Sequence, residues 1–170
     1  MACSTTLAGI ARDCAVNAGG ILRVLIASYV DVASLTETSN VITTITMETS
    51  KKFYEFYQKK GVASYTGTPS FNEDGDYTGE DGTLSLVFSR MDTTKRMQVD
   101  ALSKQDLAVI FEDANHTWWY LGKDNPVVRS GGDTTTGTAQ TDRNGYAVEL
   151  HSNDLSSPTE VDDSIIAGLL

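Results

Sequence analysis

The sequence contains few of the side chains from which catalytic and metal centres are usually built. Its 170 residues include only two histidines and two cysteines. His116 falls in a predicted turn and His151 at a predicted strand end, so we interpret both as surface polar residues. Cys3 and Cys14 match no metal-binding spacing and are interpreted as reduced thiols, with a local disulfide as the alternative. These shortages make an enzyme the least favoured class and suggest no cofactor or metal.

Positive charge is also scarce. Lys and Arg number 13 against 23 Asp and Glu, which gives a formal net charge of −10. A protein that grips nucleic acid needs a basic patch to neutralise phosphates, so this balance argues against that class. An acidic wall repels DNA instead, and that repulsion suits a channel through which DNA slides.

Long apolar runs and proline are the remaining shortages. The longest apolar stretches, at residues 24–27, 107–111 and 165–170, are too short for a membrane-spanning helix, which takes about 18 apolar residues. No Lys or Arg precedes an apolar segment near the N-terminus, so we expect no secretory signal peptide. With 40% apolar residues and three prolines, the composition is that of one folded domain over residues 1–170.

Threonine is abundant, with 21 residues, and it favours strands. Residues 41–47, VITTITM, alternate between two faces in the manner of a half-buried strand. Residues 106–112 and 117–122 flank a polar turn at 113–116 and predict a β-hairpin. Further strands are predicted at residues 21–30, 51–58 and 146–150.

The most irregular segment lies between two predicted strands in residues 62–91. It is a long acidic hairpin loop at residues 68–82, and loops of this length are usually functional or disordered. Asp74 and Asp76 fit the first half of a calcium-binding loop, but Ser85 stands where a bidentate glutamate is needed. We therefore expect no calcium there.

One helix is predicted over residues 93–104, with Asp92 as its N-cap. Residues 1–20 form a small-residue N-terminal arm, residues 130–145 form a polar loop, and the last nine residues close the chain as a short helix or a strand. Together these elements predict a mainly β fold, a β-sandwich or barrel of seven to eight strands with one flanking α-helix and the long acidic hairpin loop.

Two groups of residues suggest contact surfaces. On a strand, Trp118 and Tyr120 share one face, which we interpret as core or subunit contact, with a sugar or base platform as the alternative. Arg90, Lys95 and Arg96 are interpreted as a solvated helix start or as one half of an intersubunit ion pair.

Short segments in a fixed order carry a resemblance to a known family. They are Gly-Gly-Ile at 19–21, TTITM at 43–47, SRMDTTKR at 89–96, WWYLG at 118–122, GTAQTDRNGY at 137–146 and SIIAGLL at 164–170. In this order and spacing the chain resembles the tail tube proteins of long-tailed bacteriophages, and more loosely the tube proteins of contractile injection systems. None of these segments is a catalytic signature.

The resemblance implies a β-sandwich flanked by a helix, with six copies closing into a ring by sheet-edge pairing and rings stacking into a tube. DNA would pass through the tube without specific binding, and the other partners would be tail proteins such as the tape measure, terminator and baseplate. The protein would belong to the virion after assembly in the host bacterial cytoplasm, with no membrane partner.

The resemblance also suggests which residues make the contacts. An inter-ring stacking loop would contain Phe71, Glu73, Asp74, Asp76, Tyr77, Glu80 and Asp81. Subunit contacts would come from Arg90, Arg96, Trp118 and Tyr120. Two alternatives stay open: another virion component, such as a neck, tail terminator or capsid decoration protein, and a carbohydrate-binding β-sandwich.

Overall fold

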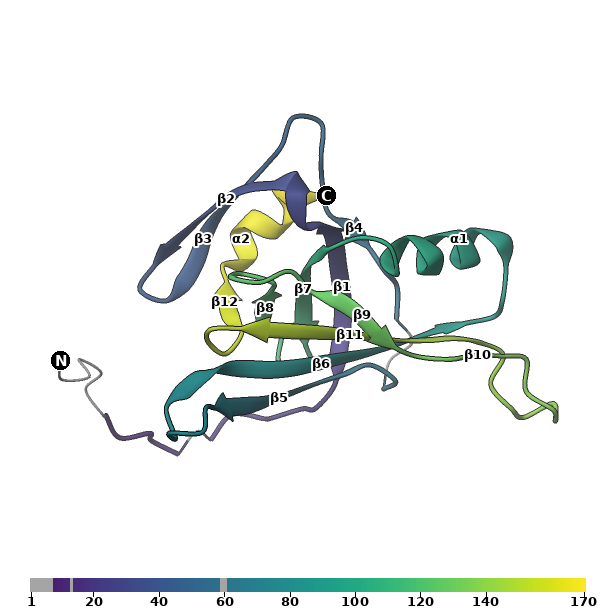
Figure 1. Cartoon of the computed structure of the whole chain (residues 1–170), viewed down its shortest axis with the longest axis horizontal. Helices are drawn as coiled ribbons and strands as arrows, with labels where there is room; N and C mark the ends of the chain where they lie inside the picture. The colour runs from purple at the N-terminus through teal and green to yellow at the C-terminus, as the bar shows by residue number, and fades with distance from the viewer. Residues whose placement is uncertain (1–7, 13, 59–60) are drawn as a thin grey trace.

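Two β-sheets pack face to face in the computed structural model, which describes residues 8–12, 14–58 and 61–170 (Figure 1). The first has seven strands in the order β2 (Val32–Thr38), β3 (Val41–Met47), β12 (Thr159–Val161), β8 (Trp118–Leu121), β7 (Leu107–Asp113), β1 (Ile21–Ser28) and β4 (Tyr54–Glu55). The second has the order β10 (Thr134–Thr135), β11 (Gly145–Asp154), β6 (Tyr77–Ser89) and β5 (Ser64–Phe71), with β9 (Val128–Gly131) also paired to β11. The predicted mainly β, sandwich-like fold is confirmed, but the described residues form twelve strands in place of the predicted seven to eight.

The apolar runs of β1 and β7 arise because the first sheet is buried on both faces. Val24 and Ile26 face the second sheet, in a core shared with Leu84 and Val148. Leu25 on the opposite face joins a second core, which the C-terminal segment covers. A strand buried on both sides has no polar face, so its sequence reads as continuous rather than alternating.

The helix predicted after Asp92 is present as α1 (Thr93–Leu102). The Asp92 carboxylate accepts a hydrogen bond from the backbone N–H of Lys95 at 2.8 Å, as an N-cap does. The helix ends two residues before the predicted boundary, and Val99 and Leu102 are its buried residues. The C-terminal segment is helical, with α2 (Asp163–Ile166) followed by the 3₁₀-helix η2 (Ala167–Leu169).

Two strand predictions need correction. Only Tyr54–Glu55 of the segment 51–58 is a strand, because the segment crosses the edge of the sandwich: Phe53 lies in the second core while Phe56 packs against the first. Strand β2 was not predicted because it is an edge strand with little buried surface. It pairs with β3 through a two-residue turn at Ser39 and Asn40, both with positive φ. A short 3₁₀-helix, η1 (Tyr29–Asp31), links β1 to β2.

The irregular loop predicted at 68–82 is mostly strand. β5 continues to Phe71 and β6 begins at Tyr77, so only residues 72–76 form the turn. Through Gly79 and Asp81 the two strands remain paired, and β6 also pairs with β11 from Glu80 onward. Two neighbouring strands supply the backbone hydrogen bonds, and this outweighs the low strand propensity of Gly, Asp and Glu. The turn of this hairpin lies at the lower left of Figure 1, away from the centre of the molecule.

The described part of the predicted N-terminal arm, residues 8–12 and 14–20, is exposed and contains neither helix nor strand. It is attached at its end, where the N–H of Ala18 donates to Asn115 Oδ1 at 2.8 Å. The polar loop predicted at 130–145 contains the end of β9 and all of β10. Its remainder is ordered by Asp142, whose carboxylate accepts from the N–H groups of Thr138 and Ala139. None of the helices described is long and apolar enough to cross a membrane.

Candidate functional site

The β5–β6 hairpin ends in an exposed aromatic pair. Phe71, the last residue of β5, and Tyr77, the first of β6, face each other edge to face with ring centroids 6.1 Å apart. Phe71 is 61% exposed and Tyr77 50%. Large apolar side chains gathered on a projecting element in this way are typical of interaction surfaces.

The turn beyond this pair has a fixed shape. The side-chain oxygen of Asn72 accepts hydrogen bonds from the N–H groups of Asp74, at 3.0 Å, and Asp76, at 2.8 Å. Its backbone N–H donates to the carbonyl of Asp76 at 2.9 Å. This side-chain bonding is typical of tight Asn-directed turns. We call residues 71–77 the acidic tip, because Glu73, Asp74 and Asp76 are all exposed on it.

Two of the predicted loop acids lie outside the tip. The carboxylate of Glu80 accepts hydrogen bonds from the Tyr65 hydroxyl, at 3.0 Å, and from Ser157 Oγ. Burial, followed by this bond to Glu80, raises the pKa of Tyr65 above its ordinary value. Asp81 Oδ1 lies 3.1 Å from Nδ1 of half-buried His151. The Glu80 carboxylate is therefore engaged within its own chain, and Asp81 faces a histidine of the neighbouring strand β11.

Strand β5 leaves one long edge of the second sheet unpaired. Among residues 8–12, 14–58 and 61–170 its one partner strand is β6, and six of its eight residues are exposed. No residue of β5 is charged. Its one proline, Pro69, has no N–H to donate and so disfavours pairing with another strand at that position. The edge is thus open to β-strand addition along most of its length.

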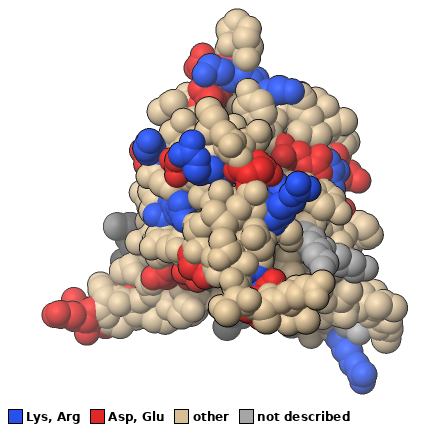
Figure 2. Space-filling model, turned by 90° about the vertical axis from the view of Figure 1, so that its right-hand side faces the viewer, with Lys and Arg blue, Asp and Glu red and all other residues tan. Residues whose placement is uncertain are grey.

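Helix α1 carries a group of cations on the other side of the molecule. Arg90, Lys95, Arg96 and Lys104 lie on the helix or beside its ends, against two acids, Asp92 and Asp100. Figure 2 faces this side and shows Lys and Arg groups gathered over its upper half, with acidic groups among them. Lys95 and Arg96 pair with acids of their own segment, at 3.1 and 3.7 Å. The side chain of Arg90 makes no ion pair with any residue that the structure describes.

Beside this helix lies a groove of about 880 Å³, which we call the α1 groove. One wall is α1, and the others are β1, the segment 54–57 and the end of β6. Aromatic and aliphatic side chains form much of the lining, including Tyr54, Phe56, Phe88, Val99 and Leu102. A groove of this size and chemistry can take bulky apolar groups.

Trp118 and Tyr120 share one face of β8, as predicted, but that face is internal. Trp118 is 6% exposed and Tyr120 1%, and both belong to the second core. Burial raises the pKa of Tyr120 above its ordinary value. Neither side chain offers surface to a neighbouring copy. Trp118 and Tyr120 are therefore core residues, and we do not assign a subunit contact to them. The alternation of residues along a strand shows which side chains share a face. It does not show whether that face is covered by the same chain or by a neighbouring copy.

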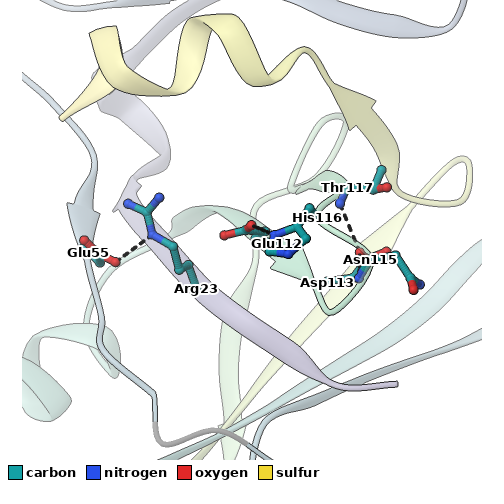
Figure 3. A network of polar contacts seen from close by, with 7 residues as sticks. All are labelled: Arg23, Glu55, Glu112, Asp113, Asn115, His116 and Thr117. Atoms are coloured by element: carbon teal, nitrogen blue, oxygen red, sulfur yellow. Dashed lines mark hydrogen bonds and ion pairs between the residues drawn. The ribbon is translucent and has the colours of Figure 1, made fainter. Parts of the chain in front are cut away.

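The turn between β7 and β8 holds a network of polar contacts (Figure 3). The carboxylate of Asp113 accepts from the N–H groups of Asn115 and Thr117 and from Trp119 Nε1. His116 Nδ1 lies 2.7 Å from Glu112, and the His116 side chain is exposed, as predicted. Because these Asp113 side-chain contacts all lie within the β7–β8 hairpin, we interpret this network as structural.

Arg23 lies next to that turn, on β1. Its Nε donates to Glu55 at 2.8 Å, and its guanidinium lies 5.2 Å from the centre of the Trp118 ring. The hydrogen bond that Arg23 donates to Glu55, more than any other contact, raises the pKa of Arg23. The pair links β1 to β4 at the edge of the first sheet.

A second hollow, of about 420 Å³, opens between the sheets. Its walls include the rings of Tyr65, Phe111 and Trp119, of which the first two stack at 5.3 Å. The polar groups at its edge are already engaged, since Asp113 binds Trp119 and Ser157 binds Glu80.

Within the described ranges, no cluster of His, Cys, Asp and Glu could hold a metal ion. Cys14 is an exposed thiol, and Cys3 lies outside the described residues. No protein-family model, curated protein or solved structure matches the chain significantly.

Proposed function

We propose that the chain is a structural virion protein, the tube subunit of a long-tailed phage. Its copies join edge to edge into rings, six to a ring in the family that it resembles, and the rings stack into a tube that encloses DNA. The observation that carries this proposal is strand β5, an uncharged and unpaired edge that leads to an exposed aromatic tip. Natural β proteins guard such edges with charges or cover them, so an open one favours pairing between chains.

The charge balance supports the same function. A net charge of −10 lets DNA move along a channel wall without adhering to it, because like charges repel. In the proposed tail, the remaining partners are the tape measure, terminator and baseplate proteins, and none of these contacts requires catalysis.

The edge itself can be tested by adding charge. Replacing both Thr66 and Thr68 with lysine places two cations on exposed positions of β5. We expect this variant to fold with an unchanged Tm but to lose assembly, measured by light scattering over a concentration series. The matched control is Thr44→Lys, an exposed position at which β3 is already paired with β2 of the same chain. Equal assembly of the edge variant and the control would contradict ring closure through β5.

Another virion component would behave differently in the same measurement. A neck, terminator or decoration protein would form trimers or single rings that never elongate as concentration rises.

The aromatic hollow favours a second candidate, a carbohydrate-binding module. Three rings around one hollow are the kind of surface on which sugars stack, although the engaged Asp113 and Ser157 leave few polar groups to orient a sugar. A monomeric protein whose glycan-array binding is lost in Trp119→Ala would support this function in place of the tube.

A further inference from the structure

We propose that the α1 groove of one copy holds the acidic tip of a second copy. This inference rests on the proposed function, since it identifies the contact by which copies would join end to end. It is carried by the charge, the apolar surface and the placement of the two elements within the fold.

The charges of the two elements are complementary. The tip presents Glu73, Asp74 and Asp76, and no described cation pairs with any of them. Such a set of like charges is repelled by most of this acidic protein and attracted only where cations gather.

Three such cations lie next to residues that line the α1 groove, and we call this border its rim. Arg90 follows Ser89, Lys104 precedes Gln105, and Lys52 lies 5.5 Å from the centre of the Tyr54 ring; Ser89, Gln105 and Tyr54 all line the groove. None of the three cations forms an ion pair with a described residue.

The two acids in the lining do not cancel this positive rim. Asp31 is paired with Lys51 at 3.0 Å, and Glu55 is paired with Arg23 at 2.8 Å. By the same placement Asp106, between the lining residues Gln105 and Leu107, adds one unpaired acid. The rim therefore offers three unpaired positive charges and one unpaired negative charge to the three unpaired negative charges of the tip.

The apolar surfaces are also complementary. Phe71 and Tyr77 are largely exposed on the tip, and the groove walls carry the rings of Tyr54, Phe56 and Phe88. A volume of about 880 Å³ exceeds what two aromatic side chains occupy. Edge-to-face and offset ring contacts would stabilise the docked pair beyond the area it buries.

The tip and the groove lie on opposite sides of the molecule, with the tip at the lower left of Figure 1 and α1 at the right. A copy therefore cannot place its tip in its own groove. A contact between two different surfaces of identical copies is head to tail, and it builds open filaments or closed rings.

The test is a disulfide between copies of the full chain, in a background where Cys3 and Cys14 are replaced by serine. One variant carries Glu73→Cys in the tip, and the other carries Thr94→Cys, an exposed position that lines the groove. The two are mixed, oxidised mildly and digested, and linked peptides are identified by mass spectrometry. The matched control replaces the groove variant with Gln140→Cys, an equally exposed site in the loop before β11.

We expect a linked peptide from the tip and groove variants and none from the tip and loop variants. Electron microscopy of each variant shows whether it still assembles. Assemblies without a tip-to-groove link would overturn this inference and leave the proposed function standing. A protein that neither assembles nor links would overturn both.

A blocking variant checks the same contact without cysteines. Ala101→Trp fills the groove from a half-buried position on α1. We expect it to lose elongation while its Tm is retained, and undiminished elongation with a retained Tm would count against the inference. If Ala101→Trp lowers Tm, Gln98→Trp replaces it in the test. Gln98 is an exposed lining position, and we expect its replacement with Trp to abolish elongation as well.

Discussion

Gly67 and Gly82 lie directly opposite each other in the β5–β6 hairpin, and the Tyr65 side chain occupies the space that their missing side chains leave. A Cβ on Gly82 would lie 2.4 Å from the Tyr65 hydroxyl, and one on Gly67 would lie 1.9 Å from Glu80 Oε1. The two glycines therefore let the Tyr65 hydroxyl reach Glu80 within a regular strand pair.

Adding a methyl group at this position should destabilise the hairpin. We expect Gly82→Ala to lower the free energy of unfolding by about 1–3 kcal/mol, as overpacking usually does. Urea denaturation measures the change. In a Tyr65→Phe background the cost should fall, because the atom nearest to the new methyl group is gone. An equal cost in both backgrounds would contradict the role given to Tyr65. Gly168→Ala, where nothing lies within 4 Å of the added Cβ, is the control.

The same glycines explain why the hairpin was only partly predictable. Gly, Asp and Glu in residues 68–82 indicate a loop when each is considered by its own propensity. The partners that keep them in strands, Asn153 and Asp154 of β11, are more than 70 positions away in the chain. By contrast, β3 and α1 were predictable because alternation and an N-cap are local signals.

Asp154 should be one of the costlier polar residues to replace. Its buried carboxylate accepts hydrogen bonds from the N–H groups of Gly122, Asp124 and Asn125, at 2.9, 3.0 and 3.1 Å. Loss of the charged acceptor leaves the buried N–H of Gly122 and the part-buried N–H groups of Asp124 and Asn125 without this partner. We therefore expect Asp154→Ala to cost about 3 kcal/mol of unfolding free energy in urea denaturation. Asp124→Ala, at an exposed position, should cost little. Equal costs would contradict the buried role of Asp154.

The N-cap of α1 gives a prediction for pH. The hydrogen bond from the Lys95 backbone N–H is the main cause that lowers the pKa of Asp92 below its ordinary value of 3.8. A carboxyl group whose pKa is lower in the folded state stabilises the fold above the unfolded pKa, and this contribution is lost as pH falls. Asp92→Asn should therefore lower Tm at pH 7, and the difference from the parent protein should shrink as pH falls through 3.8.

Thermal unfolding over a pH series measures this difference. Asp106→Asn removes the same charge from an exposed position and is the control. A Tm difference for Asp92→Asn that stays constant from pH 7 to pH 3 would show that the carboxylate does not cap the helix through its charge.

The exposed aromatic pair should matter for assembly and not for folding. Replacing Phe71 and Tyr77 together with serine removes apolar surface that is in water in the single chain, so Tm should be nearly unchanged. Elongation, followed by light scattering, should be lost. Val128→Ser, a partly exposed apolar site on β9, should retain it. Normal elongation by the tip variant would exclude the pair from the contact.

The candidate site was harder to predict than the fold. Phe71 and Tyr77 could be singled out from the sequence, because large aromatic residues stand out in an acidic segment. Their placement at the ends of two paired strands, and not inside a loop, could not. The sequence did not separate the tip acids from Glu80 and Asp81, whose partners Tyr65 and His151 come from neighbouring strands. The α1 groove could not be predicted at all, since its walls come together only in the folded chain.

The most direct test of the central claim is negative-stain electron microscopy of the purified full chain over a concentration series. The account predicts hollow rings that elongate into tubes with a central channel as concentration rises. A monomer at every concentration would contradict it.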